Sequence, residues 1–256
     1  METGEALPIA ELVDERRFLL DVAYWMLGGA GEAEGVVDET YRRWYGLSGP
    51  VRRRIVLPRS WLVRTAGGIS LGRLTPPART ADEPSTAAGA GTGAGSAELA
   101  DPACHCLRAR RSRHTSPEQY GAVARNVRQA CLTQDTGLLA SLLCPDATAF
   151  FDGGGKVRAL VGPVHGGRQV AHSLLTLLVR RPRTTLTAQS VNGRTGLVAR
   201  YEHQVAAVIS LDIADHHITR VRAVLNPDKL RLWNQRPSPG VPSSRQGPAQ
   251  RGVGWS

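Results

Sequence analysis

The chain has 256 residues, of which 41% are hydrophobic, and its 32 basic and 22 acidic side chains give a formal net charge of +10. This length allows one large domain or two smaller ones, and the basic balance favours a polyanionic partner, nucleic acid above a membrane. The sequence shows neither a basic signal segment nor an apolar run of the roughly 18 residues that span a bilayer. We therefore expect a cytoplasmic protein with no membrane partner.

The cysteines and lysines of the chain bear on metal binding and on the origin of its basic charge. The four cysteines have no framework spacing, and Cys104-His105-Cys106 has no second Cys/His cluster beside it, so we expect reduced thiols, no metal and no cofactor. All basic residues except Lys156 and Lys229 are arginines, which a GC-rich genome alone could produce. A generic basic surface is therefore the alternative to a nucleic-acid site.

Residues 9–74 are predicted to form a helical domain. Apolar side chains recur at helical spacing from Ile9 to Leu27, and Gly28-Gly29 supplies the stop. A second helix is expected from about Glu32 to Trp44, and a third opens at Pro58, a favoured first-turn residue. We expect the arginines at 52–54 to form a basic loop between these two helices.

The next two segments differ in composition. Residues 75–101 begin with Thr75-Pro76-Pro77 and continue into a stretch of almost only Ala, Gly, Thr and Ser. Such a stretch cannot bury enough apolar surface to offset its ordering entropy, so a flexible linker is expected there. Residues 102–115 are predicted to form a short basic helix. Asp101-Pro102 is a typical helix start, and four arginines come after it.

An α+β domain is predicted over residues 116–233, with a disordered tail at 234–256. Helical patterns open at Ser116, surround the leucines at 138–143 and run from Gly167 to Arg181. Asn192-Gly193 between two apolar runs is a strong hairpin signal. The order of helices and strands suggests a curved antiparallel sheet wrapped over helices. The expected strands are 146–152, 184–191, 196–201, 204–213 and 217–225.

Two groups of residues resemble a known family. The stretch from Phe18 to Gly28, with residues 33–39, 43–45 and 58–64, resembles region 2 of extracytoplasmic-function sigma factors. The motifs Asp152-Gly-Gly-Gly-Lys156 and Asn226-Pro-Asp-Lys-Leu230 are similar to the signature of the sigma subgroup with a fused C-terminal SnoaL-like domain. That domain has a cone-shaped fold like nuclear transport factor 2. The resemblance covers residues 12–74 and 118–233.

The resemblance carries functional implications. In that family, region 2 docks on RNA polymerase core and opens the −10 promoter element, region 4 reads the −35 element, and the SnoaL-like domain modulates sigma activity. For this chain it implies a non-enzymatic transcription regulator that binds polymerase core and promoter DNA, with a full-length sigma factor as a further candidate partner. Residues 103–114 alone resemble the end of region 4. A self-sufficient sigma factor is therefore not expected.

Three sets of site residues follow, the first two with a solvated charged surface as the alternative. The second helix offers carboxylates and an aromatic to a basic partner helix, and the polymerase-binding candidates are Glu34, Asp38, Glu39 and Trp44. The candidates for contacts with DNA are Arg52, Arg53, Arg54, Arg59, Arg64 and Arg73. We expect the two lysine motifs to converge on the helical segment as interdomain regulatory residues, namely Asp152, Gly153, Gly154, Gly155, Lys156, Asn226, Pro227, Asp228, Lys229 and Leu230.

A SnoaL-like enzyme or small-ligand binder with a vestigial sigma segment is the rival hypothesis. It would place an acid/base residue in the cone, paired with a carboxylate in an apolar pocket. The glycine-lysine motif is no P-loop, because its spacing differs and no Ser or Thr follows Lys156. The candidate acid/base residues are His165, His172, His203, His216 and Asp152.

Overall fold

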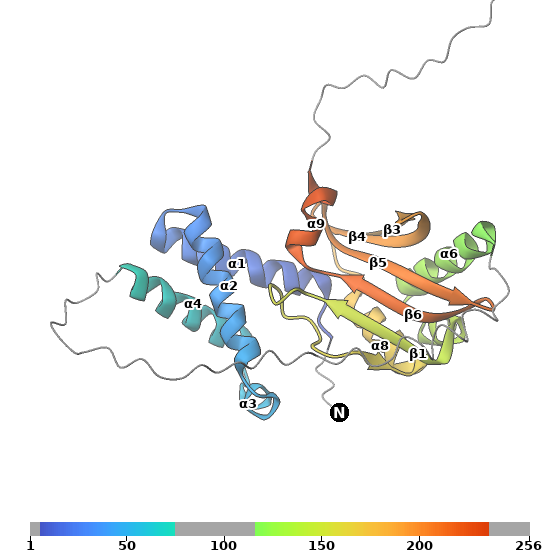
Figure 1. The fold of residues 1–256 in the computed structure, drawn as a ribbon, viewed down its shortest axis with the longest axis horizontal. Helices are drawn as coiled ribbons and strands as arrows, with labels where there is room; N and C mark the ends of the chain where they lie inside the picture. Colours follow the sequence, from blue (N-terminus) through green and yellow to red (C-terminus); the bar gives the residue numbers. More distant parts are fainter. Residues whose placement is uncertain (1–5, 75–115, 236–256) are drawn as a thin grey trace, which may run out of the picture.

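The computed structural model describes residues 6–74 and 116–235 (Figure 1). The first range holds four helices and the second a sheet with its covering helices. The expected linker, the basic segment at 102–115 and residues 236–256 of the expected tail lie outside the described residues. The helices are α1 (Ile9–Leu27), α2 (Ala30–Gly46), α3 (Gly49–Arg54), α4 (Pro58–Leu74), α6 (Pro117–Thr133), α7 (Thr136–Leu142), α8 (Gly167–Leu177) and α9 (Pro227–Asn234). The strands are β1 (Leu143–Asp152), β2 (Val164–His165), β3 (Thr184–Val191), β4 (Arg194–Tyr201), β5 (Gln204–Ala214) and β6 (His217–Val224).

The helical part packs around a small apolar core between α1, α2 and α4. Gly28 adopts a left-handed conformation with φ 77° and its N–H bonds the carbonyl of Tyr24 at 2.7 Å, which ends α1 where the sequence predicted. The core side chains recur at helical spacing, which places them on one face of each helix. They are Leu19, Ala23, Ala33, Val36, Val37, Tyr41, Trp44, Leu62, Ala66 and Ile69.

The basic segment between α2 and α4 is a helix, not the loop that we predicted. Pro50 lies in the first turn of α3 after an extended Ser48, and proline suits that position because its φ is already helical. The three arginines at 52–54 occupy the last turn, where positive charge complements the helix dipole.

The sheet has six strands in the order β2-β1-β6-β5-β4-β3. The expected antiparallel arrangement is wrong in one place, because β1 pairs with β6 in parallel, with Phe150 opposite Arg222. The last strand returns beside the first after the β3–β4–β5 meander, and it runs in the same direction. Helices combined with a curved mixed sheet are consistent with a SnoaL-like cone.

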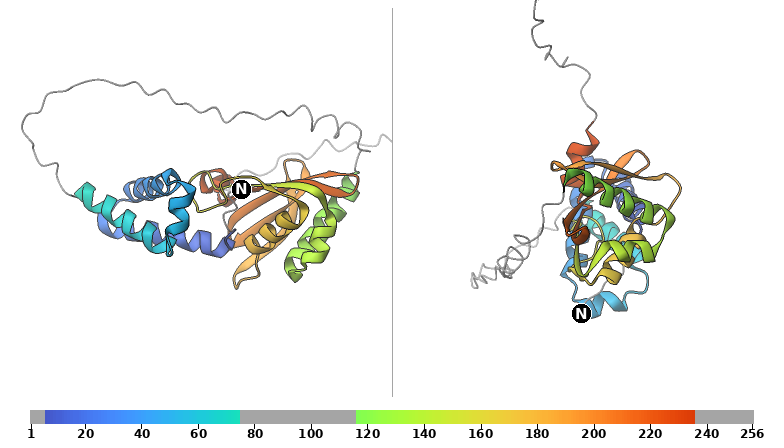
Figure 2. Two further views of the ribbon diagram at one scale, coloured as in Figure 1. Left: turned by 90° about the horizontal axis from the view of Figure 1, so that it is seen from below. Right: turned by 90° about the vertical axis from the view of Figure 1, so that its right-hand side faces the viewer.

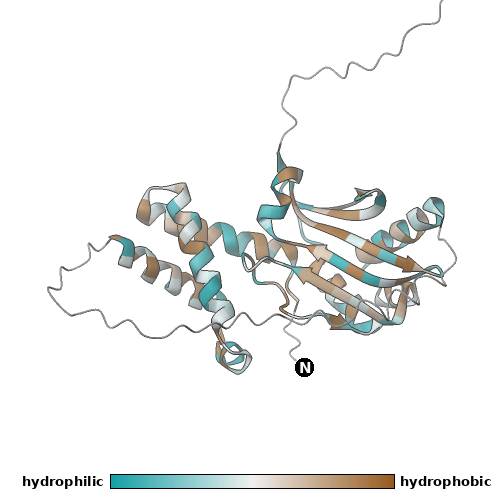
Figure 3. Cartoon of the chain, in the orientation of Figure 1, coloured by the Kyte–Doolittle hydropathy of each residue, from teal (hydrophilic) through white to brown (hydrophobic). Residues whose placement is uncertain are grey.

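Apolar residues follow one another along the central strands (Figure 3), and the middles of β4 and β5 are buried in unbroken runs, as expected of strands covered on both faces. One face is covered by α6 and α8, which lie on the same side of the sheet in Figure 2. On the other face α9 packs against β5, and Leu230 closes a small apolar cluster with Val191, Val198, Val205 and Val208. The sheet is therefore buried on both sides near β4 and β5.

Several element boundaries differ from the prediction. Helix α8 ends at Leu177, four residues before the expected Arg181, and Leu143 begins β1 instead of ending a helix. Strand β2 and helix α9 were not predicted. Asn234, assigned to the tail, lies in α9, where its side chain accepts from the Val205 N–H at 2.7 Å and donates to the Val205 carbonyl at 3.0 Å.

Helix α1 belongs to both cores. Its first turns place Ile9, Ala10 and Leu12 in the apolar core beneath the sheet, whereas Leu19 and Ala23 lie in the helical core. Burying these apolar side chains against the second part stabilises the junction by roughly 1.5–3 kcal/mol for each large one. Within the described ranges, no helix is long and apolar enough to cross a membrane.

Candidate functional site: the junction between the two parts

The first lysine motif forms a tight turn at the end of β1. Gly154 and Gly155 have φ of 59° and 66°, and the Lys156 N–H bonds the Gly153 carbonyl at 3.0 Å. The Asp152 carboxylate accepts the Gly154 N–H at 3.0 Å. A Cβ on Gly154 would lie 2.0 Å from the side-chain nitrogen of Asn226. Only glycine therefore suits position 154, both for its backbone conformation and for the close approach of the second motif.

The second lysine motif opens α9. Asn226 is the N-cap, and its side-chain oxygen accepts the Asp228 N–H at 3.0 Å, while Pro227 occupies the first turn. Asp228 and Lys229 lie in the first turn of this helix. Lys229 Nζ lies 2.6 Å from Asp152 Oδ2, so the two motifs contact each other directly.

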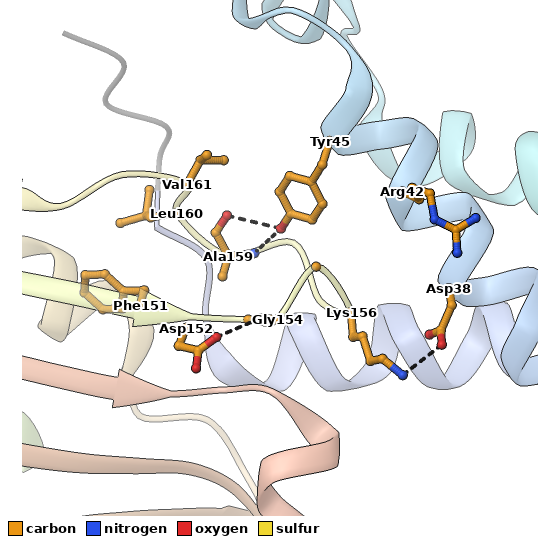
Figure 4. Close-up of a pocket in the computed structure, with 12 residues that line it drawn as sticks. Asp38, Arg42, Tyr45, Phe151, Asp152, Gly154, Lys156, Ala159, Leu160 and Val161 are labelled. Atoms are coloured by element: carbon orange, nitrogen blue, oxygen red, sulfur yellow. Dashed lines mark hydrogen bonds and ion pairs between the residues drawn. The ribbon is translucent and has the colours of Figure 1, made fainter. Parts of the chain in front are cut away.

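Lys156 joins both motifs to α2 (Figure 4). Its Nζ donates to Asp38 Oδ2 at 2.8 Å and lies 2.8 Å from Asp228 Oδ2. The Arg16 guanidinium donates to the Lys156 carbonyl at 3.1 Å and lies 3.6 Å from Asp38 Oδ1. Asp228, and after it Asp38, raises the pKa of Lys156, and Lys156 lowers the pKa of Asp228. The interdomain regulatory role of these residues stays a prediction.

A buried ion pair lies deeper in the same junction. Glu15 of α1 is 3% exposed, and its carboxylate accepts from Arg158 Nη2 at 2.9 Å and from Arg158 Nε at 3.3 Å. The Tyr41 hydroxyl also donates to Glu15 at 3.3 Å, and burial, with Glu15 beside it, raises the pKa of Tyr41. These contacts satisfy a carboxylate that would be costly to bury alone.

Tyr45 of α2 fixes the loop that follows the glycine turn. Its hydroxyl donates to the Val157 carbonyl at 2.5 Å and accepts the Ala159 N–H at 3.0 Å. Burial raises the pKa of Tyr45 to about 12. A cavity of about 600 Å³ lies between α2 and this loop, with Tyr45, Phe151 and Val161 among its walls and Arg42 at its side (Figure 4).

More exposed contacts surround this centre, and most of them pair an acid of the helical part with a base of the sheet domain. Arg181 Nη2 donates to Glu11 at 3.0 Å, and Arg231 lies 3.8 Å from Glu34. The Tyr201 hydroxyl donates to Asp14 at 2.9 Å. This complementarity sets the register of the two parts, although exposed pairs contribute only about 0–1 kcal/mol each.

The polymerase-binding candidates are placed as follows. Glu34 is exposed, Asp38 is held by Lys156, and Glu39 pairs with Arg42 and with Arg43, the latter at 3.0 Å, on its own helix. Trp44 needs correction, because it is 6% exposed and packs on Trp61 with ring centroids 5.3 Å apart. An aromatic ring in this core is not available to a partner.

The six DNA-binding candidates are spread along α3 and α4, and all but Arg52 are exposed. Arg52 lies over the ring of Tyr45 at 6.0 Å and Arg59 over that of Phe18 at 5.3 Å. Arg73 donates to the Glu32 carbonyl at 3.0 Å. The structure does not gather them into one cluster, and their contact with DNA stays a prediction.

The acid/base candidates of the rival hypothesis lie outside the sheet's core. His165, His172, His203 and His216 are exposed, and Asp152 is paired with Lys229 at the end of β1. Among the described residues 116–235, the buried polar side chains are Ser173 and Asn226. No group of three potential metal ligands occurs in the described part of the chain.

The sequence interpretation missed Glu15, Arg158 and Tyr45. A signal existed for one of them, because Glu15 falls between Leu12 and Leu19 on the apolar face of α1. A carboxylate on an apolar face needs a buried partner. Nothing in the sequence identifies Arg158 as that partner, since 143 positions separate the two residues.

Comparison with known proteins gives a limited picture. No family model matches the chain, and no curated protein does. The solved structure of the extracytoplasmic function sigma factor SigJ from Mycobacterium tuberculosis covers 88% of this chain and 98% of its own, with 18% identity and a TM-score of 0.35. An NTF2-like protein of unknown function from Mesorhizobium loti covers 43% of this chain and 93% of its own, with 14% identity and a TM-score of 0.32. An LEH-like epoxide hydrolase from M. tuberculosis covers 46% and 92%, with 14% identity and a TM-score of 0.29. At these scores none of the likenesses assigns a function.

The charges of the junction predict a pH dependence. Lys156 lowers the pKa of Asp228, so this carboxylate contributes stability that is present above its ordinary pKa of about 3.9 and is lost as the pH falls through its lower folded value. Lys156 remains protonated throughout that range, because its raised pKa matters only at alkaline pH. We expect Asp228→Asn to cost up to about 1 kcal/mol at pH 7 and progressively less below about pH 4. Urea unfolding of the unmodified chain and of Asp228→Asn from pH 7 to pH 3 measures the difference in their free energies of unfolding. A difference that widens on acidification would contradict the stabilising role of the Asp228 charge.

Proposed function

We propose that this protein is a cytoplasmic, sigma-factor-like transcription regulator that acts without catalysing a reaction. Its helical part binds RNA polymerase core and −10 promoter DNA, and its SnoaL-like domain modulates that binding. The observation that carries the proposal is the contact of Lys156 with Asp38 at 2.8 Å. Asp38 belongs to the face of α2 that the family resemblance assigns to polymerase, so the sheet domain holds a residue that the partner needs.

The neutralised charge of α2 supports this interpretation. Asp38 is shared by Lys156 and Arg16, Glu34 faces Arg231, and Glu39 is paired within α2. A basic partner helix must displace these cations before it meets the carboxylates. Because the contacts are partly exposed, each can be displaced at a cost of about 1 kcal/mol or less. The junction is therefore suited to modulate binding without abolishing it.

The core of the sheet domain supports a non-enzymatic role. Ile9 and Leu12 of α1 fill part of the apolar space beneath the sheet, and the described histidines are exposed. The large cavity at the junction has no histidine among its lining residues. A smaller cavity contains both Glu202 and His203, but the two oxygens of Glu202 accept hydrogen bonds from Arg17 and Arg183. A carboxylate held by two guanidiniums is a poor base.

Binding of labelled full-length protein to purified polymerase core tests the proposal. Lys156→Ala removes the nearer of the two cations that hold Asp38 and leaves Arg16, so we expect the variant to bind core about two- to fivefold more tightly than the unmodified chain. Lys229→Ala is the matched control, because Lys229 pairs with Asp152 inside the sheet domain. Asp38→Asn also breaks the ion pair with Lys156, but it removes the carboxylate that the partner would bind. Its affinity for core should therefore not increase. Absence of core binding in all proteins, or equal gains in both lysine variants, would refute the proposal.

A further inference from the structure

A second cluster of charged residues surrounds the turn between β4 and β5, away from the lysine motifs. Glu202 in this turn accepts from Arg17 Nη1 of α1 at 2.6 Å and from Arg183 Nη1 at 2.5 Å. Arg200 lies beside them on β4, opposite Thr185 of β3. The cluster thus combines three guanidiniums with the carboxylates of Glu202 and of Asp14, which also acts on Arg17, and one positive charge remains in excess.

The arginines are not equally satisfied. Glu202 uses both of its oxygens on Arg17 and Arg183, which together lower its pKa and keep it ionised. Arg200 donates to the Thr187 hydroxyl at 3.2 Å, and among the described residues it has no carboxylate within ion-pair distance. A half-buried guanidinium with a single hydroxyl acceptor retains unused donors.

Arg183, Arg200 and Glu202 of this cluster line a recess of about 410 Å³, whereas Arg17 lies outside it. Its walls are Arg183, Thr185, Arg200, Glu202 and His203. The volume is that of a site for a small molecule, and a recess at the end of a hairpin admits a single group more readily than a duplex backbone. The lining supplies the guanidinium donors of Arg183 and Arg200, a hydroxyl and an imidazole, together with the carboxylate of Glu202.

The backbone around the recess is strained. Arg183, Glu202 and His203 have φ of 68°, 48° and 72°, a left-handed conformation that costs free energy in any residue with a Cβ. The β3–β4 hairpin has the same left-handed conformation at Asn192-Gly193, two residues that favour such a turn. The β5–β6 hairpin has the same left-handed pair in Asp215 and His216, with φ of 49° and 67°, so this conformation belongs to the two-residue turns of the sheet and does not by itself mark a site.

We propose that this recess is an anion-binding site for a small phosphorylated molecule, with the phosphate group held between Arg183 and Arg200. The Thr185 hydroxyl and the His203 ring complete its hydrogen bonds. A planar guanidinium binds two phosphate oxygens at once, and Arg200, which among the described residues donates only to the Thr187 hydroxyl, has donors available for them. The site is independent of the contact between Lys156 and Asp38.

Titration of the full chain with inorganic phosphate and with pyrophosphate, at ionic strength held constant with sodium chloride, tests the site. Backbone amide shifts at Thr185, Arg200 and His203 should change and saturate. Arg200→Gln should weaken the binding by about tenfold or more, because a charge-assisted bidentate contact is lost. Arg200→Lys keeps the positive charge but loses the bidentate guanidinium geometry. Its phosphate affinity should therefore lie between that of the unmodified chain and that of Arg200→Gln.

Arg222→Gln is the control for a general loss of charge. Arg222 lies on the same sheet, 3.6 Å from Asp212 and outside the recess, so its replacement should leave the affinity unchanged. Equal weakening by Arg222→Gln, or shifts that do not saturate, would overturn the proposal. So would a single-stranded oligothymidylate that binds through Arg200 when neither phosphate nor pyrophosphate does.

Discussion

Replacing Arg158 by methionine is expected to lower the free energy of unfolding by about 3–5 kcal/mol. The variant keeps a side chain of similar length but leaves Glu15, 3% exposed, as a buried charge. The Tyr41 hydroxyl at 3.3 Å is then its remaining neighbour, and one hydrogen bond does not offset the desolvation of a carboxylate. Urea unfolding of the full chain measures the loss.

Arg181→Met is a matched control for this variant. Arg181 also joins the sheet domain to a glutamate of α1, at 3.0 Å against 2.9 Å for Arg158, but both side chains of its pair with Glu11 are half exposed. Solvent and salt screen such a pair, so we expect a loss of about 0–1 kcal/mol. The double variant Arg158→Met/Glu15→Met should recover most of the stability, because it removes the unpaired charge. Similar losses in the two single variants would contradict the role assigned to burial.

The second large effect concerns the glycine turn. Gly154→Ala should cost about 2–4 kcal/mol, the sum of a left-handed backbone and a collision with Asn226. The new Cβ would lie 2.0 Å from the Asn226 side chain, so the N-cap of α9 must move and the lysine motifs must separate. Urea unfolding gives the cost, and amide shifts of residues 226–230 report the displacement.

Gly155→Ala separates the two causes. Gly155 has φ of 66°, similar to the 59° of Gly154, but a Cβ there would meet nothing within 4 Å. Backbone strain alone should therefore cost about 1 kcal/mol, without displacing Asn226. If Gly154→Ala and Gly155→Ala lost the same stability, the close approach of Asn226 to position 154 would contribute nothing measurable.

The junction connects these predictions to the proposed function. Its buried centre, Glu15 with Arg158, holds the two parts in one register, while its partly exposed rim, Asp38 with Lys156, can be displaced. The difference follows from solvent, because a buried ion pair is costly to break and an exposed one is not. A partner that competes for Asp38 can thus bind while α1 stays packed beneath the sheet.

Local signals in the sequence determined most of the secondary structure. A helix begins at Ser116, Gly28 ends α1, and Asn192-Gly193 joins β3 to β4, all as predicted, although the capping box between Ser116 and Gln119 was not. These features depend on interactions between residues within a few positions of one another, so they can be recognised from the sequence. The composition also singled out Lys156 and Lys229, the only two lysines in the chain.

Which distant residues meet depends on how the elements pack in three dimensions. The parallel pairing of β1 with β6, the seat of α9 on the sheet and the burial of Trp44 all depend on contacts between distant segments. Lys156 and Asp38 are 118 positions apart, and Arg158 and Glu15 are 143 apart. Periodicity and capping report the neighbours of a residue along the chain, whereas the partner of a charge is set by how whole elements pack. For that reason most helices, most strands and the two motifs could be predicted from the sequence, whereas the partners of their charges followed from the packing of the fold.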